Sequence, residues 1–240
     1  MEDETCLMHI PDGFLAPAVW AALDAGAIPA VGYHVRRTQR TFEQSRIPLL
    51  GVLGAFVFAA QMINFPIWAG TSGHLVGGAL LALTLGPGAA VVVMTAILVV
   101  QALVFQDGGL LALGANVINM AVIGVWAGYL PARWLSGRTG SGKVVAFVAG
   151  WLSLMAGATF ASLELWFSDV APAIPLFASM LGIHALTGLA EGAITAASLA
   201  AIERLNPEFV YANGAGNPPV VVKKTPAAEP VARQAAASGH

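Results

Sequence analysis

Two histidines stand out in an otherwise apolar sequence, because each lies in a short polar segment that could bind a metal ion. His9 belongs to the turn-like segment Met8-His9-Ile10-Pro11-Asp12-Gly13, and His74 closes Gly70-Thr71-Ser72-Gly73-His74. If Met8 begins the mature chain, its α-amine, the amide nitrogen of His9 and the His9 ring can close two chelate rings on one ion. His74 would then supply a fourth nitrogen. Tetragonal nitrogen sites suit Ni(II) and Cu(II), whereas Zn(II) prefers tetrahedra.

The sequence therefore predicts a metal site made by Met8, His9 and His74. Binding should weaken in acid, because the donor nitrogens must lose protons. The plainer interpretation is a surface-loop histidine at position 9 and, at position 74, a helix-start histidine bonded to a carbonyl.

The composition is that of an integral membrane protein. Of the 240 residues, 57% are hydrophobic and 10% are charged, against about 25% charged in a soluble domain. Apolar stretches of about 18–25 residues are long enough to cross about 30 Å of hydrocarbon as helices. Period-2 alternation, which would indicate a β-barrel, is not seen. A single cysteine, Cys6, excludes a disulfide within the chain and a thiolate metal cage.

We expect an all-α, polytopic bundle of about seven transmembrane helices, over residues 15–35, 47–65, 74–85, 89–105, 112–134, 144–167 and 175–204. Residues 1–7 read as an N-terminal extension without a signal peptide, residues 8–205 as the transmembrane domain, and residues 206–240 as a disordered cytoplasmic tail.

The positive charges predict the orientation. All eleven Lys and Arg residues fall at the very end of the first, fifth or seventh expected helix or in the segment that follows it. By the positive-inside rule the N-terminus lies outside and the C-terminus is cytoplasmic, in the cell (inner) membrane. His9 and the Gly70–His74 loop then share the outer face.

Several small or polar residues within the expected helices have roles that the sequence leaves open. A stripe of small residues on the first helix would let another helix approach closely: Ala18, Ala22, Gly26 and Ala30. His184 and Glu191 lie on one face of the last helix, as outer support for a site, a packing pair or a subunit contact. Interhelical hydrogen bonds are the expected role of Gln61, Gln101, Asn116 and Asn119.

These segments resemble the CbiM/NikM family, the metal-binding membrane subunits of energy-coupling-factor (ECF) transporters for cobalt and nickel. The likeness covers about residues 8–205. It is carried by Met8-His9-Ile10-Pro11-Asp12-Gly13-Phe14-Leu15, Gln61-Met62-Ile63-Asn64-Phe65-Pro66, Gly70-Thr71-Ser72-Gly73-His74-Leu75, Phe105-Gln106-Asp107-Gly108-Gly109-Leu110, Leu113-Gly114-Ala115-Asn116 and His184-Ala185-Leu186-Thr187-Gly188.

The resemblance implies a seven-helix fold whose N-terminus is outside and inserted into the helix core. It implies that Met8, His9 and His74 bind Ni(II) or Co(II), the transported ion, with no catalytic cofactor. It also implies a transmembrane coupling protein, two cytoplasmic ATPase subunits and a small accessory membrane protein as partners. The small-residue stripe would dock the coupling protein, and this subunit would hydrolyse nothing. No nucleic-acid patch is expected.

One feature departs from the family, in which the Met-His pair is the mature N-terminus. Here seven residues precede Met8, and an internal Met8 has no free amine. Translation could start at Met8, which we favour, the extension could be trimmed, or the protein could bind metal differently.

Two other functions compete with transport. Gly70-Thr71-Ser72-Gly73 fits the Gly-x-Ser-Gly pattern of rhomboid-type intramembrane proteases, with Ser72 as nucleophile and His184 as base. That match leaves the Met-His start unexplained. A passive channel would need a ring of charges or a repeated filter, and neither is visible. The run Gly137-Arg138-Thr139-Gly140-Ser141-Gly142-Lys143 fits Gly-x-x-x-x-Gly-Lys, but Val144 follows it where a Walker-type motif has Ser or Thr. The sequence therefore lacks the full motif, which agrees with separate ATPases. The sequence does not distinguish cobalt from nickel as the transported ion. The segments Asn64-Phe65-Pro66 and Gly70-Thr71-Ser72-Gly73-His74 are slightly nearer those of the nickel-type members of the family.

Overall fold

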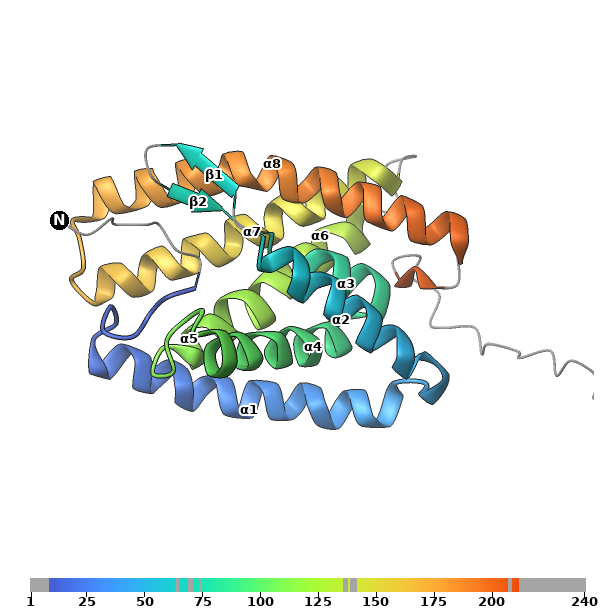
Figure 1. Cartoon of the computed structure of the whole chain (residues 1–240), viewed down its shortest axis with the longest axis horizontal. Helices are drawn as coiled ribbons and strands as arrows, with labels where there is room; N and C mark the ends of the chain where they lie inside the picture. Colours follow the sequence, from blue (N-terminus) through green and yellow to red (C-terminus); the bar gives the residue numbers. More distant parts are fainter. Residues whose placement is uncertain are drawn as a thin grey trace, which may run out of the picture.

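The computed structural model describes residues 9–63, 65–68, 71–73, 75–135, 138, 142–206 and 209–211, and in this part the chain is a helical bundle with one small hairpin (Figure 1). The elements in chain order are α1 (Pro17–Thr41), a short 3₁₀ turn η1 (Gln44–Arg46), α2 (Ile47–Gln61), the strands β1 (Phe65–Trp68) and β2 (Thr71–Gly73), α3 (Gly78–Leu85), α4 (Pro87–Val100) with its π-helical end η2 (Gln101–Phe105), α5 (Leu113–Asn116), the π-helix η3 (Val117–Gly124), α6 (Val125–Leu135), α7 (Gly142–Phe167) and α8 (Ala173–Leu205).

Seven helical segments are present in the described residues, as expected, if α4–η2 and α5–η3–α6 each count as one. Four are long and apolar enough to cross a membrane by themselves: Pro87–Phe105, Leu113–Leu135, Gly142–Phe167 and Ala173–Leu205. The α1 and α2 region adds a fifth only when the two helices, bent by 112° at their junction, are taken as one span. The expectation that all seven cross the membrane is therefore wrong for α3, whose eight residues rise only about 12 Å.

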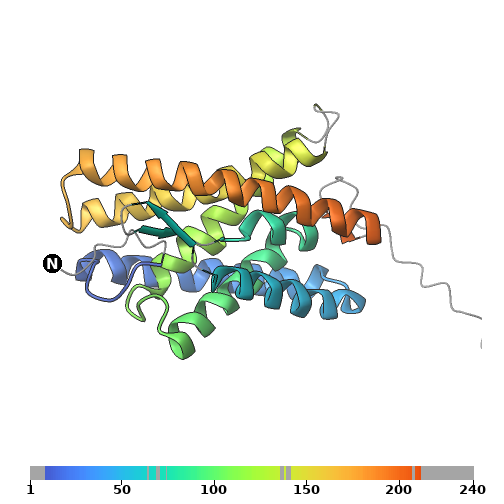
Figure 2. The ribbon, with the colours of Figure 1, turned by 45° about the horizontal axis from the view of Figure 1, so that its top comes forward.

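The second expected helix also ends earlier than its apolar stretch suggested. It stops at Gln61 instead of residue 65, because β1 pairs with β2 as an antiparallel hairpin there, with Phe65 opposite Gly73. Figure 2 shows this hairpin in the same half of the bundle as the start of α1. The third helix begins at Gly78, four residues after the position predicted.

The short helix α3 lies at the centre of the bundle. Every residue from Gly78 to Leu85 is buried. The main core cluster gathers side chains from α2, α3, α4, η3, α6 and α7 around it. A helix buried on all sides must be apolar all round, which explains the uninterrupted run Gly78-Ala79-Leu80-Leu81-Ala82-Leu83. The helix ends at Leu85, because the next residue, Gly86, has a φ of +82°, which is not helical and separates α3 from α4.

Helices α7 and α8 form a long antiparallel pair along one side of the bundle (Figure 1). Glycines permit their close approach: a Cβ on Gly150 would stand 2.8 Å from Thr195 Oγ1 and 3.0 Å from the Cα of Gly192. Small residues at helix crossings supply the packing that drives association in lipid.

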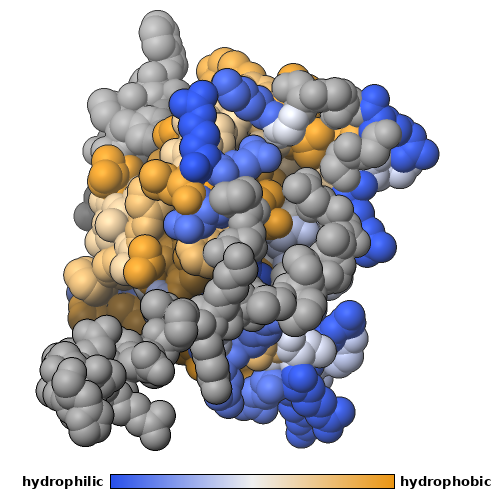
Figure 3. Space-filling view, turned by 90° about the vertical axis from the view of Figure 1, so that its right-hand side faces the viewer, coloured by the Kyte–Doolittle hydropathy of each residue, from blue (hydrophilic) through white to orange (hydrophobic). Residues whose placement is uncertain are grey.

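The described basic residues gather at one end of the bundle, the right-hand end in Figure 1, where α1 and α8 finish and α7 begins. Figure 3 views this end directly and shows hydrophilic residues along it. The grouping matches the charge pattern that predicted the orientation. Which face of the membrane this end occupies stays a prediction of the positive-inside rule.

Candidate metal centre

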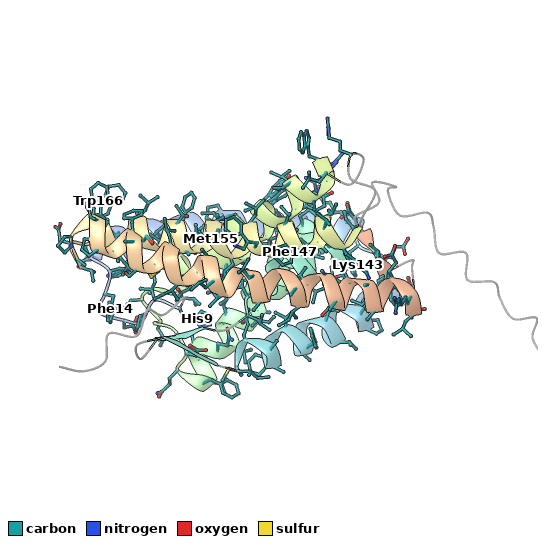
Figure 4. The ribbon with its side chains drawn as sticks, turned by 90° about the horizontal axis from the view of Figure 1, so that it is seen from above. His9, Phe14, Lys143, Phe147, Met155 and Trp166 are labelled. Atoms are coloured by element: carbon teal, nitrogen blue, oxygen red, sulfur yellow. The ribbon has the colours of Figure 1, made fainter. Side chains whose placement is uncertain are left out.

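The segment that follows Met8 lies inside the bundle. His9 is 3% exposed and Ile10 1% exposed. Ile10 and Leu15 belong to a buried cluster whose other members come from the region of α5 and from α7 and α8: Ala112, Ala115, Ala161, Leu165, Leu176 and Met180. Figure 4 shows His9 toward the end of the molecule opposite Lys143. The expected insertion of the N-terminal segment into the helix core is thus observed for His9, Ile10 and Leu15, whereas residues 12–14 between them are exposed.

Asn116 fixes this segment by pairing with both backbone groups of Ile10. The N–H of Ile10 donates to Asn116 Oδ1 at 2.8 Å, and Asn116 Nδ2 donates to the Ile10 carbonyl at 3.1 Å. The N–H of Gly109 donates to the same carbonyl at 2.9 Å. All of these groups are shielded from solvent, and a buried backbone amide without a partner is costly. These hydrogen bonds therefore fix the position of Ile10, and with it that of the neighbouring His9, within the bundle.

Asp12 makes a second contact between the N-terminal segment and the loop that precedes α5. Its carboxylate accepts the N–H groups of Leu110 at 3.1 Å and Leu111 at 2.7 Å. A Cβ on Gly109 would overlap the Asp12 carboxylate and backbone, so only glycine fits there. Gly108, at φ +95°, supplies the turn that bends this loop around residues 9–12.

The ring of His9 faces an acid from the same loop. His9 Nδ1 lies 2.9 Å from Asp107 Oδ1. An ionised carboxylate only accepts hydrogen bonds, so Nδ1 is the donor in this contact. Asp107 is positioned by its own backbone, whose N–H donates to the Gln101 carbonyl at 3.1 Å at the end of η2.

His74 and Met8 lie outside the described residues, so the meeting of His9 with His74 remains a prediction. The residues that follow His74 are described, and they are held tightly. The N–H groups of Val76 and Gly77 donate to the two carboxylate oxygens of Glu191 at 2.9 and 2.8 Å. Glu191 is 2% exposed and closes the N-terminal end of α3 from the neighbouring helix α8.

A chain of amides connects the two neighbourhoods. Gln61 Nε2 donates to the Val76 carbonyl at 2.6 Å, and Gln101 Nε2 donates to Gln61 Oε1 at 2.9 Å. Since the carbonyl of Gln101 also accepts from Asp107, one hydrogen-bonded path runs from the partner of His9 to the residue two positions after His74.

The other polar residues singled out from the sequence make hydrogen bonds within the bundle. The Gln61–Gln101 bond confirms the expected interhelical hydrogen bonding, as does Asn119 Nδ2, which donates to Glu164 Oε2 at 2.7 Å. Asn116 instead binds the N-terminal segment. His184 directs Nδ1 to the Met180 carbonyl of its own helix at 2.6 Å.

The small-residue stripe of α1 lies on the outer side of the helix. Ala18, Ala22 and Gly26 are exposed, Ala30 is half-buried, and a Cβ on Gly26 would meet nothing within 4 Å. A role for this stripe in subunit contact stays a prediction.

Among the described residues, no three His, Cys, Asp or Glu side chains lie close enough to hold a metal ion. Sequence reasoning missed Asp12 and Asp107 as positioning residues, and it left outer support for a site as one of three roles open to Glu191. The available signal was a carboxylate inside or beside an apolar span, which is expensive unless something pairs with it.

The bundle, its candidate spans and the buried residues His9, Ile10 and Leu15 define a multi-pass membrane protein in which part of the segment before α1 is inserted between the helices. Residues 9–209 match the family model described as the cobalt uptake substrate-specific transmembrane region, CbiM, and the chain belongs to this family.

Similar proteins that carry a name are named as metal transport proteins, in agreement with the family. A putative metal transport protein of Haloquadratum walsbyi is 42% identical over 209 residues, covering 85% of this chain and 94% of the relative. A putative fused nickel transport protein NikMN of Archaeoglobus fulgidus is 40% identical, covering 85% and 68%. The cobalt transport protein CbiM of Geobacter sulfurreducens is 36% identical, covering 88% and 64%.

A crystal structure of a truncated transition metal transporter superposes with a TM-score of 0.78 at 30% identity, over 82% of this chain and 99% of that one. These relatives are transport proteins, and the protease hypothesis built on Ser72 and His184 receives no support from them.

Proposed function

We propose that this chain is the metal-binding membrane subunit of an ECF-type importer of Ni(II) or Co(II), which captures the ion on the outer face through Met8, His9 and His74. A transmembrane coupling protein would connect it to two cytoplasmic ATPase subunits, and a small accessory membrane protein would complete the complex. The chain would bind and release the ion without hydrolysing ATP. Membership of the CbiM family and relatives named for nickel and for cobalt support this proposal.

The observation that carries the proposal is the anchoring of residues 9–12. Asn116 and Asp12 make four hydrogen bonds between this segment and the 110–116 region. A short terminal segment pinned inside a bundle loses little conformational freedom when it binds an ion, so its nitrogen donors are preorganised. The amide path from Asp107 to Val76 supports a second donor arriving from the His74 loop.

The contact between His9 and Asp107 suggests how the empty site is kept in place. Only Nδ1 of His9 can close a six-membered chelate ring with the amide nitrogen of the same residue. In the structure this nitrogen faces Asp107 Oδ1 at 2.9 Å. The incoming ion would therefore replace the carboxylate at Nδ1, and Asp107 would hold the ring when no ion is bound.

The proposal is tested by comparing two forms of the purified protein, one starting at Met8 and one with a blocked extension ahead of Met8. The Met8-start protein should load one Ni(II) or Co(II), and the extension should weaken loading by more than a few fold. Unchanged affinity would rule out the terminal amine as a ligand. N-terminal sequencing of protein isolated from membranes, with metal content measured on the same sample, identifies the natural start.

Paired variants separate the loop histidine from its neighbour. His74→Ala and His9→Ala should each abolish tight metal loading, while Ser72→Ala, two residues away in the same loop, should leave loading unchanged. Full loading by His74→Ala would remove the loop histidine from the proposed site.

A further inference from the structure

Two buried polar side chains face each other where η3 crosses α7. Asn119 is 1% exposed and Glu164 6% exposed. Asn119 Nδ2 donates to Glu164 Oε2 at 2.7 Å. Within the described part of the chain, the other two oxygens of the pair, Asn119 Oδ1 and Glu164 Oε1, are buried and have no hydrogen-bond partner.

The pair has no compensating positive charge among the described residues. Glu164 forms no ion pair there, and the described Lys and Arg residues sit at helix ends, outside this part of the interior. A carboxyl group in an apolar interior is expensive unless it is paired or coordinates a metal ion. Two buried oxygens without donors therefore form a place that a cation would complete.

The pair lies next to the segment that carries His9, one turn deeper. Asn116, which holds Ile10, is three residues before Asn119, and such side chains are neighbours on a helix, with Cβ atoms about 5–6 Å apart. Glu164 follows, by nearly one turn of α7, Ala161, which belongs to the cluster around Ile10. The helix from Leu113 to Leu135 runs toward the basic end of the bundle (Figure 1), so Asn119 is nearer to that end than Asn116 is.

One further feature singles out this crossing, and another buried polar group lies about 16 Å farther along α7. Asn119 stands within a π-helix, a rare conformation that recurs at functional sites. Toward the basic end of α7, Ser153 Oγ is buried and also has no partner among the described groups. A Cβ on Gly78 would stand 3.0 Å from this hydroxyl, so it lies at the start of α3.

We propose that Asn119 Oδ1 and Glu164 Oε1 form a second cation site, which receives the divalent transition-metal ion after it leaves His9. The inference rests on the function proposed above. Carboxylate and amide oxygens bind Ni(II) and Co(II) less strongly than imidazole and amine nitrogens do. The second site would therefore bind the ion weakly and transiently, since transport requires that an ion can leave each site that it enters.

The test uses the Met8-start protein with its first site filled by one equivalent of Ni(II), and Mn(II) as the probe of the second site, because oxygen ligands suit Mn(II). Loss of the free Mn(II) signal in electron paramagnetic resonance measures binding. Glu164→Gln keeps the size of the side chain and removes its charge, and Glu203→Gln, exposed near the end of α8, is the matched control. We expect Glu164→Gln to weaken Mn(II) binding about tenfold or more and to leave Ni(II) loading of the first site unchanged.

The same variants are then assayed for Ni(II) uptake by cells that contain the whole transporter. Glu164→Gln should slow uptake about fivefold or more, and Glu203→Gln should not. Asn119→Asp adds a second carboxylate and should tighten Mn(II) binding, which keeps the test decisive if Glu164→Gln fails to fold. Unchanged Mn(II) binding in both variants, or unchanged uptake by a folded Glu164→Gln protein, overturns the second site. Failure of the wild-type protein to load Ni(II) at all would instead refute the proposed function.

Discussion

Asn116→Ala is the most direct test of the anchoring of the N-terminal segment. The substitution removes two hydrogen bonds to Ile10, each worth about 0.5–1.5 kcal/mol net. It also leaves the buried N–H of Ile10 unpaired, which costs about 1–3 kcal/mol. The Ile10 carbonyl keeps its bond from Gly109, so its lost bond costs only about 0.5–1.5 kcal/mol. With the unpaired N–H, counted once, the total loss is about 1.5–4.5 kcal/mol of docking free energy.

Asp12 still holds the segment in this variant, so a fraction of the molecules keeps residues 9–12 docked. The loss of Ni(II) affinity is therefore smaller than the full loss of docking free energy. We expect Ni(II) binding to weaken by about 10- to 100-fold, since each 1.4 kcal/mol is a factor of ten and the apparent affinity scales with the docked fraction. Competition with a chromogenic chelator of known affinity, on the detergent-purified Met8-start protein, measures the change.

Asn206→Ala, at the exposed end of α8, is the control and should bind Ni(II) as the wild type does. Thermal unfolding of both variants reports whether the bundle stays intact. If a folded Asn116→Ala protein binds Ni(II) within about twofold of the wild type, docking of residues 9–12 does not prepare the metal site, and the reasoning fails.

Three further predictions concern the same region. Glu191→Gln replaces one acceptor of the two loop amides with a donor; Ni(II) loading should fall about tenfold or more, because charge-assisted hydrogen bonds are worth about 1.5–3 kcal/mol, and the exposed Glu203→Gln should change nothing in the same titration. Gly109→Ala pushes Asp12 out of its contact, so proteolysis of the N-terminal segment should speed up, whereas Gly142→Ala, whose Cβ meets nothing within 4 Å, should digest at the wild-type rate. Lowering the pH should release bound Ni(II), seen in dialysis against buffered solutions, because the donor nitrogens regain their protons; retention in acid would argue against an amine and amide chelate.

The positions of the helices could largely be read from the sequence, since long apolar stretches in a chain with few charges leave the backbone few other ways to form its hydrogen bonds. The break at Gly86 between α3 and α4 was also predictable, because Pro87 starts a helix well and Gly86 supplies the positive φ. The lengths were less predictable. The residues of α3 read as one more span, yet the helix is an eight-residue piece wrapped by its neighbours, because lipid and the interior of a bundle are equally apolar.

The sequence by itself determined the class of protein and one half of the candidate site: a basic end, apolar helices and a histidine in a polar start. Only the tertiary structure decided what holds that histidine. Asp107 and Asn116 reach His9 and Ile10 across 98 and 106 positions, and Glu191 reaches Val76 across 115. No local pattern encodes such pairs, since they depend on how the helices pack and on which backbone groups that packing leaves without partners.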